Sequence, residues 1–129
     1  MANILVAAVP KPREILERIL DAHDLACADT LARAKRLLRT QRVELIVCTI
    51  LFDESRMIDF LRLVKAKAEW RRIPFLCSRV KIQPIGDPVA LEAVEITCRA
   101  TGAEAFLDIA TFENNSEQRM RTEMEKFLV

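Results

Sequence analysis

The stretch VELIVCTILFDESRMIDFL, residues 43–61, decides the fold that the sequence predicts. Residues 45–51 are apolar apart from Thr49, so we expect a strand that is buried on both faces. A short acidic loop follows, and apolar residues then recur at helical spacing. Such a strand belongs in the middle of a parallel sheet, with helices on each side. Open α/β sheets collect their chemistry at the carboxyl ends of strands, which places Thr49, Asp53 and Glu54 at the mouth of any site.

The same alternation of strand and helix runs along the whole chain. Apolar runs predict four more strands, at residues 3–9, 25–28, 73–80 and 105–109. Helical spacing predicts helices around residues 15–20, 31–41, 57–64, 88–98 and 116–127. Asp29 or Thr30 is expected to cap the second helix, Asp87 with Pro88 to begin the fourth, and Gly102 to end it. The sequence therefore predicts a (βα)5, doubly wound α/β protein with one domain over residues 1–129.

Composition sets limits on the kind of protein. The chain has 129 residues and a formal net charge of +1, which does not point to an ionic partner. Its first apolar run is shorter than the ~20 residues of a membrane span, so we expect a cytoplasmic protein without a membrane segment. The four cysteines form no C-x-x-C pair and are expected to be buried free thiols. Cys48 and Cys77 are the pair to test for a redox role.

Four segments carry a resemblance to a known family. They are ILVAAV (residues 4–9), ELIVCT (44–49), IPFLCSR (73–79) and GAEAFLDIA (102–110). In this order they are similar to the conserved strand patterns of the receiver domain of two-component response regulators. That resemblance covers nearly the whole chain. It implies a flavodoxin-like fold with strand order 2-1-3-4-5.

The resemblance also identifies positions where this chain departs from the family. Receivers hold Mg²⁺ with acids after the first strand, accept a phosphoryl group on an aspartate that ends the third, sense it with Thr or Ser on the fourth, and pair it with a lysine on the fifth. The corresponding residues here are Ala8, Val9, Thr49, Arg79 (or Ser78, if the register shifts by one) and Ile109. Neither alanine nor valine offers Mg²⁺ an oxygen ligand, and a threonine hydroxyl cannot become an acyl phosphate. We therefore expect a degenerate pseudo-receiver that works without phosphorylation, catalysis, cofactor or metal.

Two further interpretations of this region stay open. Arg79 could pair with Asp53 or Glu54 and fix the loop that follows the central strand, or it could face solvent. The emptied site could instead bind a small molecule under the loop of residues 81–87. That pocket would be lined by Ala7, Ala8, Thr49, Arg79 and Ile109.

The partner surface is predicted from the resemblance, because receivers commonly bind partners or dimerise through the fourth helix, fifth strand and fifth helix. The candidates are Leu91, Val94, Glu95, Phe106, Asp108, Arg119 and Glu123. We expect a protein partner rather than nucleic acid, with a homodimer through this surface as one form.

Other side chains fall into weaker patterns. Basic residues concentrate in residues 33–42 and 62–72, while acidic residues gather late in the chain, a polarity that would suit head-to-tail contact. His23 is expected at the surface, and Trp70 either covers a sheet edge or is exposed.

Overall fold

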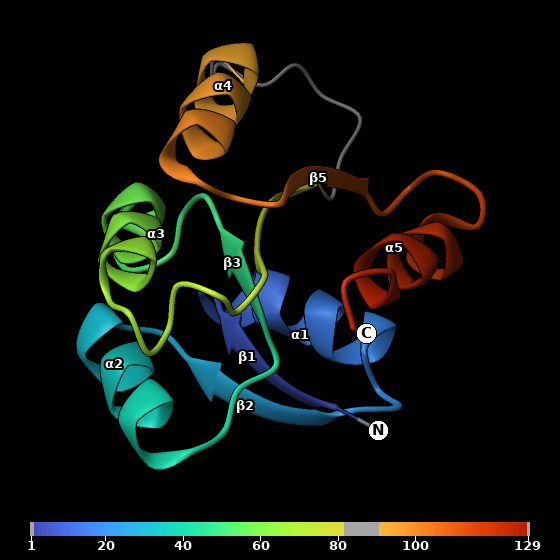
Figure 1. The fold of residues 1–129 in the computed structure, drawn as a ribbon. Coiled ribbons are helices and arrows are strands. Elements are labelled where there is room, and N and C mark those ends of the chain that lie inside the picture. Colours follow the sequence, from blue (N-terminus) through green and yellow to red (C-terminus); the bar gives the residue numbers. More distant parts are fainter. Residues whose placement is uncertain (1, 82–90, 129) are drawn as a thin grey trace.

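A computed structural model describes residues 2–81 and 91–128. The strands are β1 (Asn3–Ala7), β2 (Asp24–Ala28), β3 (Leu45–Thr49), β4 (Phe75–Lys81) and β5 (Ala105–Ala110). The helices are α1 (Pro10–Ile19), α2 (Leu31–Thr40), α3 (Met57–Ala66), α4 (Leu91–Thr101) and α5 (Ser116–Glu125). The strands are parallel and lie in the order β2-β1-β3-β4-β5 (Figure 1). This confirms the predicted flavodoxin-like α/β fold.

The sheet separates two hydrophobic cores. All five residues of β3 are buried, and their side chains alternate between the two faces. Leu45 and Val47 belong to the core under α1 and α5, whereas Ile46 and Cys48 belong to the core under α2, α3 and α4. Figure 1 shows α1 and α5 on one side of the sheet and α2 and α3 on the other. A strand that is apolar throughout is therefore explained by a helical layer on each face.

The carboxyl end of β3 differs from the prediction. The strand ends at Thr49 and not at Leu51, because the chain turns there and the amide of Phe52 donates to the carbonyl oxygen of Thr49 at 3.1 Å. Leu51 is 56% exposed in this turn, while Phe52 is fully buried. The amide of Ile50 still donates to the carbonyl oxygen of Ser78 at 3.0 Å, but the pairing of β3 with β4 ends there, so the apolar character of residues 50 and 51 did not continue the strand.

Two of the predicted helix ends are confirmed. The hydroxyl oxygen of Thr30 accepts a hydrogen bond from the amide of Arg33 at 3.2 Å, so Thr30 rather than Asp29 caps α2. Gly102 follows α4 with a φ of 114°, in the region that favours glycine. The predicted start of the fourth helix at Asp87 and Pro88 lies outside the described residues.

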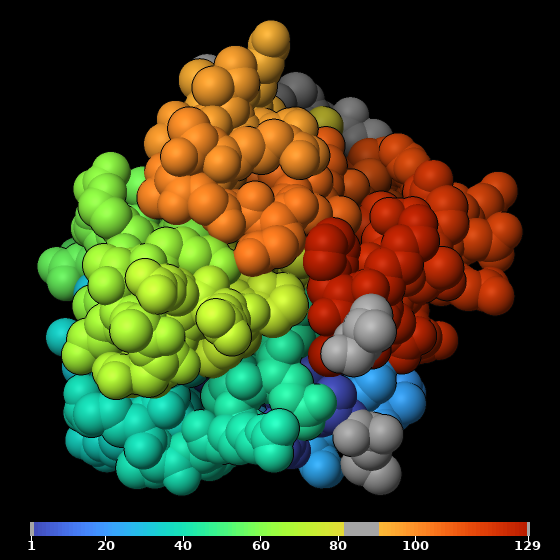
Figure 2. Space-filling model, in the orientation of Figure 1, coloured from blue at the N-terminus to red at the C-terminus, as the bar shows by residue number. Residues whose placement is uncertain are grey.

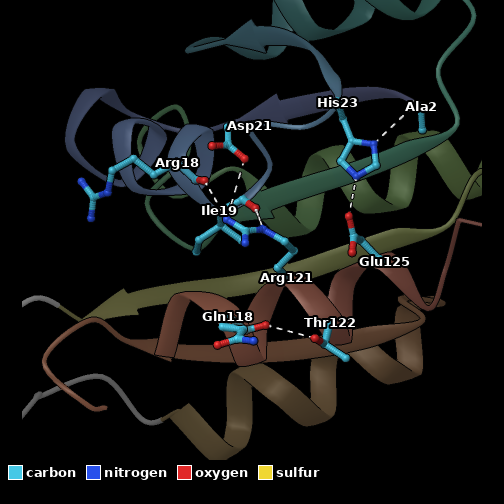
Figure 3. A network of polar contacts seen from close by, with 9 residues as sticks. All are labelled: Ala2, Arg18, Ile19, Asp21, His23, Gln118, Arg121, Thr122 and Glu125. Carbon is cyan, nitrogen blue, oxygen red and sulfur yellow. Dashed lines mark hydrogen bonds and ion pairs between the residues drawn. The ribbon is translucent and has the colours of Figure 1, made fainter. Parts of the chain in front are cut away.

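A polar network fastens α5 to the start of the chain (Figure 3). His23 accepts from the amide of Ala2 through Nδ1 at 3.2 Å, and its Nε2 lies 2.7 Å from Oε2 of Glu125. Arg121 donates from Nε to the carbonyl oxygen of Ile19 at 2.6 Å, where α1 ends with carbonyls that lack helical partners. The prediction of a surface histidine is wrong, because the side chain of His23 is 11% exposed.

A second set of contacts joins the ends of α3, β4 and α4. The ammonium group of Lys65 donates to the carbonyl oxygens of Arg71 and Ile73 and pairs with Glu104 at 2.8 Å. Glu104 in turn accepts from the amide of Phe75 at 2.7 Å. Lys65 therefore holds the structure together and is not free to join a basic surface.

Trp70 is 6% exposed, which excludes the alternative that it lies in solvent.

Within residues 2–81 and 91–128, no helix combines the length and apolar character needed to cross a membrane.

We predict that Arg121→Ala lowers the free energy of unfolding by about 1–2 kcal/mol, because it removes a charge-assisted hydrogen bond to the end of α1. Urea unfolding followed by circular dichroism measures this change. Arg99→Ala is the matched control, since Arg99 is exposed and pairs with Glu95 on the surface of α4. Its effect should stay within about 0.5 kcal/mol. Equal losses in the two variants would contradict a specific role for Arg121.

Candidate functional site

Thr49 lies at the carboxyl end of β3, where this fold class places its chemistry. It is 2% exposed, and its hydroxyl oxygen is buried without a hydrogen-bond partner among the described residues. Ala8 and Ile109 are fully buried in the core under α1 and α5, to which Thr49 also points by the alternation of β3. Val9 is half-buried at the start of α1. The described side chains at this end of the sheet are thus mainly apolar.

The neighbouring strand resolves the choice between Ser78 and Arg79. Thr49 is the register partner of Ser78, which is fully buried and donates its hydroxyl to the carbonyl oxygen of Cys48 at 3.1 Å. Arg79 is one residue further along β4 and, by alternation, lies on the opposite face with Phe75 and Cys77. The residue beside Thr49 is therefore Ser78.

Arg79 forms a bidentate ion pair with Asp108 on β5. Its Nε donates to Oδ1 and its Nη2 to Oδ2, each at 2.9 Å, and the two residues are register partners across the strands. The side chain of Arg79 is 9% exposed and that of Asp108 is 45% exposed. Among the described residues, Arg79 pairs with Asp108 and not with Asp53 or Glu54. Neither open alternative for Arg79, a pair with the acidic loop or exposure to solvent, is correct, because the buried Arg79 pairs with Asp108 on β5.

The acidic loop has a structural role that the sequence did not reveal. Oδ2 of Asp53 accepts from the amide of Leu31 at 2.8 Å and so caps α2 from a distant part of the chain. Asp53, Glu54 and Ser55 all have positive φ, at 44°, 57° and 68°. Left-handed backbone costs about 1–2 kcal/mol for each such residue, so other contacts must hold this loop in place.

No described arrangement of side chains is suited to a metal ion. Across residues 2–81 and 91–128, no group of three or more His, Cys, Asp or Glu side chains is placed to ligate one. Asp59 is 64% exposed on α3, beside Arg62 at 4.0 Å, and so is directed to solvent.

Three of the four cysteines lie in one core. Cys48 and Cys77 are register partners on β3 and β4, and Cys98 of α4 is buried beside them. All are free thiols. Burial raises the pKa of Cys48 well above its usual value, while hydrogen bonding with Cys98 and burial raise the pKa of Cys77. The redox role of Cys48 and Cys77 stays a prediction.

Part of the predicted interface surrounds a groove between β5 and α5. The groove has a volume of about 690 Å³, and four of the seven predicted residues line it: Phe106, Asp108, Arg119 and Glu123. Leu107 and Met120 add apolar surface to its wall.

The α4 residues of the predicted interface are placed differently. Leu91 and Val94 are half-buried against the core, and Glu95 pairs with Arg99 along the helix. The apolar residue that α4 presents to solvent is Ile96, which is 61% exposed. Its position on the outer side of an amphipathic helix was the signal that sequence reasoning missed.

Comparison with known proteins identifies the fold. No family model and no curated protein sequence matches the chain. Solved structures do match. A response regulator from Hahella chejuensis is 17% identical, with a TM-score of 0.77 over 100% of this chain and 96% of that one. The phosphorylated cyanobacterial phytochrome response regulator RcpA is 14% identical, with a TM-score of 0.78 over 98% of this chain and 93% of that one. The Mn²⁺-bound response regulator Rcp1 is 15% identical, with a TM-score of 0.77 over 99% and 95%. The chain thus has the fold of response regulator receiver domains.

We predict opposite effects for two substitutions of Thr49. Thr49→Val keeps the shape and removes a buried hydroxyl without a partner, so the free energy of unfolding should stay the same or rise by about 1 kcal/mol. Thr49→Asp places a carboxylate among apolar side chains and should lower it by about 3 kcal/mol or more. Urea unfolding measures both. Thr122→Val on the exposed side of α5 is the control and should change it by about 0.5 kcal/mol or less. A stable Thr49→Asp variant would contradict the apolar character of this site.

We also predict that iodoacetamide modifies Cys27 first in the folded protein at pH 8. Cys27 is half-buried, whereas Cys48, Cys77 and Cys98 are fully buried. Burial raises the pKa of Cys27 as well, and hydrogen bonding with Cys77 lowers the pKa of Cys98, so the order of modification follows from access of the reagent to each thiol. Mass spectrometry should find one adduct at early times and four after unfolding in urea. Rapid native modification of Cys48 or Cys77 would show that their core opens.

Proposed function

We propose that this protein is a non-enzymatic, phosphorylation-independent pseudo-receiver that binds a protein partner in signalling. The observation that carries the proposal is the buried Thr49 at the end of β3, whose hydroxyl has no partner in the described part of the chain. A working phosphoacceptor site needs an accessible carboxylate, a metal and a cation that stabilises the phosphoryl group. In their places the chain has Thr49, Ala8 and Ile109. The four free cysteines suit a reducing compartment and support a cytoplasmic location.

The partner is proposed to bind the surface of α4, β5 and α5. The groove beside β5 combines apolar wall residues, Leu107 and Met120, with charges that already have partners. Asp108 pairs with Arg79, Arg119 with Glu113 at 2.9 Å, and Glu123 with Lys126 at 2.9 Å. An apolar patch with satisfied charges at its rim is typical of protein interfaces. Ile96 is a separate exposed apolar side chain on α4, the helix that packs against β5.

The alternative of a small-molecule site receives less support from the described residues. Ala7, Ala8 and Ile109 are fully buried by their neighbours, so a ligand here would have to displace packed side chains. The proposed covering loop, residues 81–87, lies outside the described residues except for Lys81. A thermal-shift screen with nucleotides and metabolites tests this alternative, which requires a compound that stabilises the fold.

We predict that acetyl phosphate with Mg²⁺ leaves the mass of the intact protein unchanged, because no described carboxylate replaces Thr49 at the end of β3. Intact-mass spectrometry makes the measurement, with a receiver domain that carries the aspartate treated in parallel. Addition of one phosphoryl group to the folded protein would overturn the proposal of phosphorylation independence.

We predict that Ile96→Glu lowers the recovery of a specific co-purifying protein about tenfold, since it places a charge on the proposed interface. Quantitative mass spectrometry compares tagged variants purified from the native host. Leu51→Glu makes the same change at an exposed residue of the loop after β3 and should keep the partner. If the partner is a second copy, sedimentation velocity should show a dimer that Ile96→Glu weakens and Leu51→Glu does not. Retention of every partner and of the oligomeric state by Ile96→Glu would contradict this surface.

A further inference from the structure

A second hollow lies at the opposite end of the sheet, where β3 and β4 begin. Its volume is about 370 Å³, and its walls come from the residues before these two strands and from the end of the chain. Figure 2 shows the three segments meeting on one face, in green-blue, yellow and red. Val43, Ile73, Phe127 and Leu128 supply its apolar surface. The hollow is thus separate from the strand ends discussed above and from the groove beside β5.

Two arginines at this hollow have no side-chain partner among the described residues. Arg42 and Arg72 both line it and are exposed, and in the described part of the chain neither side chain forms an ion pair or hydrogen bond. The acid in the described lining is Glu44, whose Oε1 accepts from the amide of Asn3 at 3.2 Å. The described lining therefore carries two cations against one anion, and the anion already has a donor.

Exposed basic side chains, together with the exposed acid Glu69, also lie on the elements that lead into the hollow. Helix α2 and the segment after α3 present further exposed basic side chains that have no ion-pair partner among residues 2–81 and 91–128: Arg33, Arg36, Arg39 and Arg71. The acidic residues near the end of the sequence, by contrast, form ion pairs with other residues of the same chain. Glu117 pairs with Arg18 at 2.6 Å, and Glu125 lies 2.7 Å from His23. Glu104, Asp108, Glu113 and Glu123 are also paired, whereas Glu14, Glu69 and Glu92 are exposed and form no ion pair among the described residues. The acids that gather late in the chain are thus mostly paired within the molecule, and the two arginines of the hollow are available to an external anion.

The apolar surface of the hollow limits which class of anionic ligand fits it. A nucleic-acid backbone needs a row of cations and leaves an apolar hollow unfilled. An acidic peptide that carries a bulky apolar side chain satisfies both features. We infer that this hollow binds a short acidic segment of a partner protein, with one apolar side chain between Val43, Ile73 and Phe127 and flanking carboxylates on Arg42 and Arg72.

Fluorescence anisotropy tests the inference with a fluorescein-labelled peptide in which two acidic residues precede and two follow a central phenylalanine. We expect saturable binding to the full chain at low salt, which weakens as salt rises. Replacing phenylalanine by serine, or the acids by their amides, should each weaken binding about fivefold or more. A single-stranded oligonucleotide with the same label should bind more weakly than the acidic peptide.

Charge-reversal variants place the binding on the molecule. The double variant Arg42→Glu with Arg72→Glu should lose about tenfold or more in affinity. The control, Lys11→Glu with Arg99→Glu, changes the net charge equally at exposed residues of α1 and α4 and should lose less than about twofold. Circular dichroism checks that both fold. The inference is overturned by equal losses in the two double variants, by tighter binding of the oligonucleotide, or by no saturable peptide binding up to about 1 mM.

Discussion

The burial of β3 on both faces is the constraint on which the rest of the structure depends. Its five residues contribute to two separate cores, so helices must cover each side of the sheet. Parallel neighbours β1 and β4 then pair with it along both edges, and connections through helices return the chain in the same direction. The carboxyl ends of all these strands meet at one edge, which fixes the place of any site of the receiver type.

The same alternation divides the polar groups at that edge. Thr49 points toward the layer of α1 and α5, together with Ile109, whereas Arg79 and Asp108 lie on the side of α4. The ion pair of Arg79 with Asp108 thus lies on the opposite face of the sheet from Thr49. Arg79 and Asp108 satisfy each other as register partners, and Thr49 is left among apolar groups.

The strands and helices could be predicted because they depend on local periodicity and on short-range caps such as Thr30, whereas the strand order followed from the family resemblance. Sequence reasoning failed for side chains whose partners lie far along the chain. His23 is joined to Glu125 and Lys65 to Glu104, and neither pairing leaves a periodic signal. Asp53 was expected in an acidic loop at the mouth of any site, yet it caps α2, a contact that exists only once the third strand lies beside the first. The chemistry expected at the strand ends came from family resemblance, whereas Ser78 beside Thr49 required the actual register.

The loop after β3 shows how these long-range contacts act together. Its three residues with positive φ together cost about 3–6 kcal/mol relative to ordinary backbone. The bond from the amide of Leu31 to Asp53 offsets about 1.5–3 kcal/mol. Burial of Phe52, whose ring centroid lies 5.6 Å from that of Phe60, offsets a similar amount. Movement of the loop would release this backbone strain, but it would also break the cap of α2 and expose an aromatic core residue, so the contacts balance the cost of the loop conformation. The loop conformation therefore depends on two contacts with the folded core, the bond of Asp53 to the start of α2 and the packing of Phe52 on Phe60.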